Sequence, residues 1–292
     1  MQGLASVDIW AISAILAKAL EYATALLALG GPLFVTTFRK APEDVLWIAR
    51  RLTIAAAIAG SVLLAMRFGI RAARISGMGV AGMTDMMMLS LIWEGPLGSA
   101  AVMRGVGALM VLAILFRGVF ASTLALIGSG LIAVSYAQIG HALGDPRWVL
   151  ATLLTVHLLA VGFWIAALAP LFHASALRDA GPLLHRFGVV ALIIVPILML
   201  VGVSFAWFML GSFNSLFDTD YGWMLLLKIT IFAGLLTLAA LNKLRFVPAF
   251  LAGEFAASAR LRRSIGIEAF CVLLILTVTA TLTSVTVPPV NL

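Results

Sequence analysis

Residues 187–211 read FGVVALIIVPILMLVGVSFAWFMLG, a stretch without a single charged side chain. An α-helix rises about 1.5 Å per residue, so roughly 20 apolar residues cross the hydrocarbon core of a bilayer. This stretch is therefore long enough to span a membrane as one helix. A helix is expected because its backbone hydrogen bonds are satisfied internally, as a lipid environment requires.

Seven further stretches share this apolar character. The eight predicted spans are 8–37, 52–72, 98–116, 119–140, 148–171, 187–211, 222–241 and 265–287. The composition agrees, since 63% of the 292 residues are hydrophobic, 11% are charged and the mean hydropathy is +1.15. We therefore expect an all-α, polytopic membrane helical bundle of about eight transmembrane helices, with residues 1–292 as a single integral membrane domain. Only Arg117 and Gly118 separate the third span from the fourth, so seven spans is the alternative.

The basic residues are distributed unequally between alternate loops. One side holds Arg39, Lys40, Arg50, Arg51, Arg117, Arg178, Arg186, Lys243, Arg245, Arg260, Arg262 and Arg263, and the other holds Arg67, Arg71, Arg74 and Arg147. Because cytoplasmic loops carry the excess of Lys and Arg, both termini are expected to face outward. Arg67, Arg71 and Arg74 depart from this pattern. The net charge of +7 is dispersed over short loops without a nucleic-acid-binding motif, so no nucleic acid partner is expected.

Several ionisable residues fall inside the predicted spans, where each costs about 2.5–3.5 kcal/mol on insertion scales. Lys18 and Glu21 are three residues apart on one helix face, which favours a self-neutralising pair over a proton path. Arg104 and Lys228 each lie about two turns inside a span, where they either position an anionic group or extend to the interface. Glu268, near the inner end of the last span, is expected to pair with one of the arginines that precede it.

Five methionines lie between the second and third spans, in a predicted outer loop. They are Met78, Met83, Met86, Met87 and Met88. Thioether sulfur is a soft ligand that suits Cu(I), so this segment is a candidate metal site. The alternative is packing alone, because methionine is also common in apolar interfaces.

Two histidines are placed to extend such a site into the membrane. His157 lies about ten residues into the fifth span, and His141 lies at the outer end of the fourth, where it continues a polar stripe through Ser135 and Gln138. Imidazole also suits copper, so both histidines are candidate metal ligands, with an ordinary buried histidine as the alternative. Candidate pathway residues are Met103, Met110, Gln138, Arg104 and Lys228, and two further methionines, Met209 and Met224, fall near the outer ends of spans six and seven.

Short motifs in the second half of the chain occur in a recognisable order. They are Gly140-His141-Ala142, the stretch from His157 to Trp164, Arg186-Phe187, the stretch from Thr219 to Gly222, Leu226-Leu227-Lys228, Asn242, Pro248 and Glu268. In this order, residues 140–288 resemble the copper-resistance protein D (CopD) family of bacterial inner-membrane copper transport proteins. The first 130 residues agree with that family only in hydropathy and general layout. The resemblance implies copper handling between periplasm and cytoplasm, often alongside a separate periplasmic copper-binding protein of the CopC type.

We therefore expect a multi-pass protein of the bacterial inner membrane that binds a copper ion through periplasmic Met and His ligands and moves it toward the cytoplasm. An enzyme is not expected, because the sequence lacks the glycine-rich phosphate loop of a nucleotide hydrolase. One alternative is a membrane b-type cytochrome that uses His157 and another intramembrane histidine as haem ligands. Another is a non-transporting copper-site assembly factor. The sequence is compatible with either oxidation state of copper, Cu(I) or Cu(II). It is also compatible with either a monomer or a homo-oligomer.

Overall fold

The computed structural model describes residues 9–177 and 179–290, which are helical with short connections and contain no β-strand. Among the described residues, eight helical spans are long and apolar enough to cross a membrane, three of them together with the short helical segments that continue them, which confirms the predicted architecture. The long helices are α1 (Ile9–Thr37), α2 (Glu43–Ser76), α4 (Pro96–Val111), α5 (Val119–Ser135), α6 (Arg147–Ala174), α7 (Gly181–Leu210), α9 (Asp220–Leu241) and α11 (Ala257–Val285). The short segments are η1 (Gly79–Thr84), α3 (Met86–Glu94), η2 (Leu112–Leu115), η3 (Tyr136–Gln138), η4 (Gly140–Leu143), α8 (Ser215–Asp218), η5 (Asn242–Phe246) and α10 (Val247–Leu251).

A definite turn separates the third span from the fourth. Phe116 is extended, with ψ 154°, and Gly118 has φ +119°, a backbone conformation that L side chains rarely adopt. The predicted count of eight spans, rather than the alternative of seven, is thus correct over the described residues.

Helix α2 is longer than the predicted span 52–72. It begins at Glu43, where two acidic residues in the first turn suit the helix dipole, and Gly77 ends it in the left-handed conformation. Five arginines assigned above to the two sides of this span therefore lie on the helix itself, namely Arg50, Arg51, Arg67, Arg71 and Arg74. Its 34 residues give a rod of about 51 Å, longer than the hydrocarbon core of a bilayer is thick.

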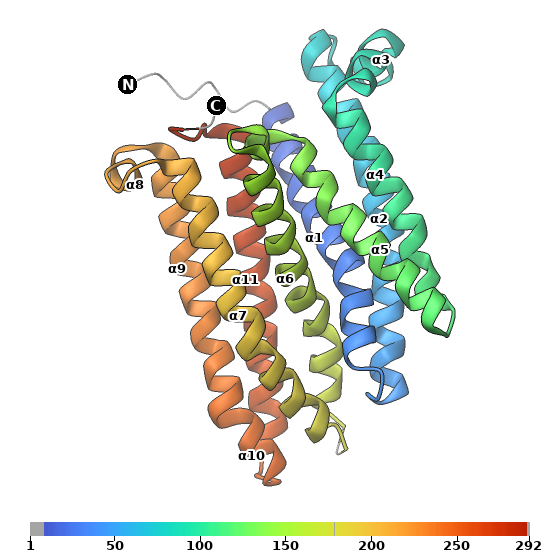
Figure 1. Ribbon diagram of the computed structural model, residues 1–292, viewed down its shortest axis with the longest axis vertical. Helices are drawn as coiled ribbons and strands as arrows, with labels where there is room; N and C mark the ends of the chain where they lie inside the picture. Colours follow the sequence, from blue (N-terminus) through green and yellow to red (C-terminus); the bar gives the residue numbers. More distant parts are fainter. Residues whose placement is uncertain (1–8, 178, 291–292) are drawn as a thin grey trace.

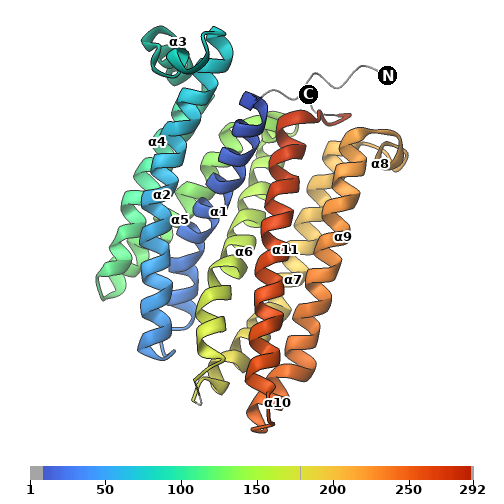
Figure 2. The ribbon, with the colours of Figure 1, turned by 180° about the vertical axis from the view of Figure 1, so that it is seen from behind.

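Helices α1, α6 and α11 form the middle of the bundle (Figures 1 and 2). Helices α2, α4 and α5 cover one side of it, and α7 and α9 form the opposite edge. The start of α1 and the end of α11 lie at the same end of the bundle, together with α3 and α8. We call this the α3 end. The structure does not contain a membrane, so the outward orientation of this end remains an expectation from charge.

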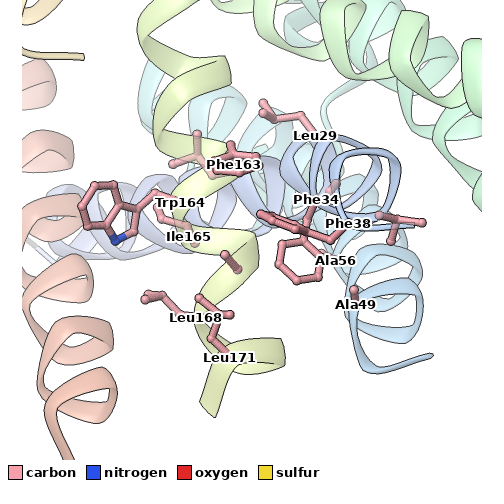
Figure 3. Close-up of a cluster of buried hydrophobic side chains, with 14 of the residues drawn as sticks. Leu29, Phe34, Phe38, Ala49, Ala56, Phe163, Trp164, Ile165, Leu168 and Leu171 are labelled. Atoms are coloured by element: carbon pink, nitrogen blue, oxygen red, sulfur yellow. The ribbon is translucent and has the colours of Figure 1, made fainter. Parts of the chain in front are cut away.

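The central contact between α1 and α6 depends on two glycines. A Cβ atom on Gly30 would lie 1.9 Å from the carbonyl oxygen of Gly162, so only glycine permits this approach. Beside it lies the main apolar core, in which Phe38, just after the end of α1, contacts both Phe34 of α1 and Phe163 of α6 (Figure 3). Close packing of this kind stabilises helix association in a membrane, where apolar burial gives little driving force.

Candidate functional site

His157 faces helix α7 from α6. A Cβ atom on Gly202 would lie 3.6 Å from Cε1 and 3.7 Å from Nδ1 of His157. The Nδ1 atom is buried and has no hydrogen-bond partner within the described ranges. Buried polar atoms are usually satisfied, so an unpartnered imidazole nitrogen next to a glycine marks a candidate ligand position.

From His157 toward the α3 end, the same interface contains methionine sulfur. Leu150 of α6 and Met209 of α7 belong to one buried cluster, and Met209 is fully buried at 0% exposure. Leu150 precedes His157 by seven residues and Met209 follows Gly202 by seven, so both lie about 10 Å nearer the α3 end on the same helix faces. Met224 of α9 packs against this cluster.

Lys228 of α9 lies within electrostatic range of His157. It follows Met224 by four residues, which places the two side chains on one face of α9, with Lys228 one turn further into the membrane. His157, Met209, Met224 and Lys228 thus form a series along α6, α7 and α9, with Met209 and Met224 in one cluster nearer the α3 end than His157. We call these four residues the α6–α7–α9 site.

From His157 away from the α3 end, the next polar group on this face of α6 is Trp164, again seven residues along. Its Nε1 donates to Glu268 of α11 at 3.4 Å, and Asn242 donates to the other carboxylate oxygen of Glu268. Figure 3 shows Trp164 on the side of α6 away from Phe34 and Phe38.

The expected pairing of Glu268 with a preceding arginine is wrong. Arg262 instead lies 4.3 Å from the ring centroid of Phe172, whereas Glu268 takes its partners from α6 and the π-helical turn η5. The Oδ1 atom of Asn242 is buried without a hydrogen-bond partner in the part of the chain that the structure describes. A π-turn of this kind is frequent at functional sites.

The methionine segment forms a small cap of η1 and α3 at the end of α2 and α4, far from α7 and α9 (Figures 1 and 2). Met78, Met86 and Met87 are 60%, 78% and 75% exposed. Met83 instead packs against Gly69 of α2, and Met88 packs against the apolar cluster between α2, α3 and α4. Met86, Met87 and Met88 are consecutive in one helical turn, about 100° apart, so these three sulfurs do not share a face.

The remaining candidates lie on other elements. Met110 packs beside Gly128 at the α4–α5 contact, and Met103 is half-buried on the same helix as Arg104. Gln138 in η3 accepts from Arg147 at 3.4 Å. His141 lies in η4, and its side chain falls outside the described part of the structure.

Another buried carboxylate, outside the proposed copper ligands, forms ion pairs with two arginines. Glu21 is 2% exposed and forms ion pairs with Arg67 of α2 and Arg104 of α4. Arg104 also donates from Nε to Ser135 Oγ at 2.9 Å and stacks over the ring of Tyr136, 3.8 Å from its centroid. Of the two roles considered for Arg104, positioning an anionic group is the correct one.

The expected Lys18–Glu21 pair is wrong. Lys18 donates instead to the carbonyl oxygen of Thr283 on α11, at 2.8 Å. The reason is competition, since each oxygen of Glu21 already meets an arginine from a neighbouring helix.

Within the described ranges, no three His, Cys, Asp or Glu side chains converge as they would around a metal ion. The α6–α7–α9 site contains one imidazole and two thioethers, so its donor set is soft and low in charge. Such donors suit a monovalent copper ion better than a hard divalent cation.

Two family models match the sequence and together cover most of it. Residues 181–282 match copper resistance protein D, and residues 8–148 match the copper resistance protein D-like N-terminal domain. The chain belongs to the copper resistance protein D family. The likeness thus reaches into the first half, which the sequence motifs had connected to the CopD family only by hydropathy. Searches of curated proteins and of solved structures gave no significant match.

Membership in the CopD family makes this a copper-related membrane protein. Both matched regions contribute helices to the main apolar core, since α1 of the first and α11 of the second pack on each other and on α6. The sequence had drawn attention to Met209 and Met224 without assigning them a role. Leu150, His157 and Trp164 are spaced seven residues apart, which places them on one face of α6. This spacing could have identified, from the sequence, the face of α6 that carries His157.

Proposed function

We propose that this protein carries copper across the bacterial inner membrane through the α6–α7–α9 site, from the α3 end inward. The observation that carries the proposal is the buried, unpartnered Nδ1 of His157, which faces Gly202 of α7. The sulfur of Met209 lies about two helical turns nearer the α3 end. In this path the ion passes from Met209 and Met224 to His157. It then passes toward Glu268, whose carboxylate offers an anionic oxygen near the inner end.

Weak, successive sites suit transport, because an ion must leave each position as readily as it enters. Thioether and neutral imidazole ligands add no negative charge to stabilise the ion strongly at one point. Lys228 adds repulsion, which is twice as large for a divalent ion as for a monovalent one. The site therefore favours Cu(I) over Cu(II).

The exposed thioethers of Met78, Met86 and Met87 offer a first contact for copper at the α3 end. His141 in η4, a short segment of the connection between α5 and α6, is a second candidate there. A separate periplasmic donor of the CopC type would deliver the ion to this end of the bundle. The direction of copper transport is then set by the copper gradient or the membrane potential, without nucleotide hydrolysis.

The test is copper uptake into proteoliposomes that contain the purified protein. His157→Ala should abolish most of the protein-dependent uptake, whereas the control His185→Ala, an exposed histidine near the start of α7, should not. Equal uptake by the His157 variant and the wild type, at equal amounts of inserted protein, would overturn the proposal. A Soret absorbance band in the purified protein would favour the b-type cytochrome instead, and copper binding without uptake would favour the assembly factor.

A further inference from the structure

A basic cavity opens at the α3 end of the bundle, separate from the α6–α7–α9 site. Its volume is about 420 Å³. It is lined by the basic residues Lys18, Arg67, Arg71 and Arg74, by the apolar residues Ala14, Ile70, Ile75 and Leu97, and by Ser284. Helices α1, α2, α4 and α11 thus contribute to one cavity that carries only positive side-chain charge.

The positive charge of this cavity is largely unneutralised. Of its four cations only Arg67 forms an ion pair within the described ranges, and its partner Glu21 is shared with Arg104. Lys18 donates to the backbone of Thr283 and to the hydroxyl of Ser284, which carry no charge. Arg71 and Arg74 are exposed and have no ion-pair partner among the described residues.

The three arginines share one face of α2. They follow one another by four and three residues, the spacing that aligns side chains along a helix. They occupy the last three turns of a helix about 51 Å long, so their guanidinium groups fall near the level of the lipid headgroups. These are the same residues that depart from the charge pattern of the other loops, and a bound anion would account for their position.

We infer that this cavity binds the phosphate group of an anionic lipid headgroup. Guanidinium groups donate paired, charge-assisted hydrogen bonds to phosphate oxygens, and the Lys18 ammonium adds a further donor. Basic pockets between membrane helices are a recognised setting for anionic headgroups. The apolar lining of Ile70, Ile75 and Leu97 favours a lipid over free phosphate, because it can cover the glycerol and upper acyl carbons.

The experiment measures lipid binding to the purified full-length protein by native mass spectrometry, with phosphatidylglycerol and phosphatidylcholine as probes. The variant is Arg71→Gln with Arg74→Gln, since both side chains are exposed and neither supports a buried contact. The matched control is Arg39→Gln with Lys40→Gln, two exposed basic residues at the opposite end of the bundle. A second variant, Arg71→Lys with Arg74→Lys, keeps the charge.

We expect phosphatidylglycerol to bind in preference to phosphatidylcholine. Its binding should weaken roughly 10- to 30-fold in the double Gln variant, remain near wild type in the control and be largely retained in the double Lys variant. Unchanged phosphatidylglycerol binding in the double Gln variant would overturn the inference, as would equal binding of the two lipids. Displacement of the lipid by millimolar inorganic phosphate would also overturn it, by identifying the site as one for the free anion.

Discussion

Glu21 of α1 and Arg104 of α4 form an ion pair inside the bundle, with exposures of only 2% and 6%. Arg67 of α2 meets the same carboxylate, so one acidic side chain joins three helices. The network is ringed by aromatic and hydroxyl groups, with Tyr136 beneath Arg104 and Tyr22 edge-on to Tyr136 at 5.7 Å. Because both oxygens of Glu21 are committed to arginines, this carboxylate serves the assembly of the bundle.

Glu21→Gln should destabilise the protein strongly. The change removes the negative charge and leaves Arg67 and Arg104 without an anionic partner, at a cost of about 3–5 kcal/mol for a broken buried pair. Thermal unfolding in detergent, followed by the loss of helical circular dichroism, measures this. Glu254→Gln is the control, because the Glu254–Arg260 pair is exposed and contributes little. A Glu21 variant as stable as this control would contradict the structural role.

The eight spans were predictable because each one is an uninterrupted apolar run, a property of the local sequence. The partner of Glu21 was not predictable in this way. Choosing between Lys18 on the same helix and arginines on two others depends on how α1, α2 and α4 are rotated against one another. That rotation is set by close contacts such as Thr53 beneath Gly31, which the sequence pattern does not reveal.

The candidate site was predictable only in part, for a similar reason. His157 was recognisable because an imidazole deep in an apolar helix is costly unless it has a role. The methionines that accompany it come from α7 and α9, and their meeting depends on the pairing of those helices. The methionine-rich segment attracted attention by its density, although the consecutive positions of Met86, Met87 and Met88 already argue against one shared ligand face.

Lys228→Gln should strengthen copper binding at the α6–α7–α9 site. At an effective dielectric constant near 20, a unit charge on Lys228 would repel a monovalent ion by roughly 1–2 kcal/mol at a separation on the order of 10 Å, and at such a separation its removal raises affinity roughly tenfold. The gain should be larger for Cu(II) than for Cu(I), which reduces the selectivity between the two ions. Competition titrations with a chelator for each oxidation state provide the measurement, and Lys228→Arg is the charge-preserving control. Unchanged affinity in the Gln variant would show that Lys228 exerts no repulsion on the bound ion.

The exposed methionines of the cap should matter most when copper is scarce. Replacing Met78, Met86 and Met87 by Leu removes three accessible sulfurs and keeps apolar bulk, so uptake should fall several-fold at low copper and recover at high copper. The matched control is Met83→Leu with Met88→Leu, which changes the packed methionines of the same segment. Proteoliposome uptake over a range of Cu(I) concentrations separates the two variants. Equal curves for both would show that the cap does not capture copper.

Met209→Leu with Met224→Leu tests whether the two thioether sulfurs on the α3 side of His157 take part in transport. Leucine and methionine have similar volume, so the double variant should lose less than about 3 kcal/mol of stability and keep its helical signal. If the thioethers hand the ion to His157, protein-dependent Cu(I) uptake should fall at least tenfold. The control Met199→Leu alters an exposed methionine of the same helix α7 and should leave uptake unchanged. A double variant that folds and transports as the control does would reduce both methionines to a packing role, and would leave His157 as the one copper ligand of the α6–α7–α9 site.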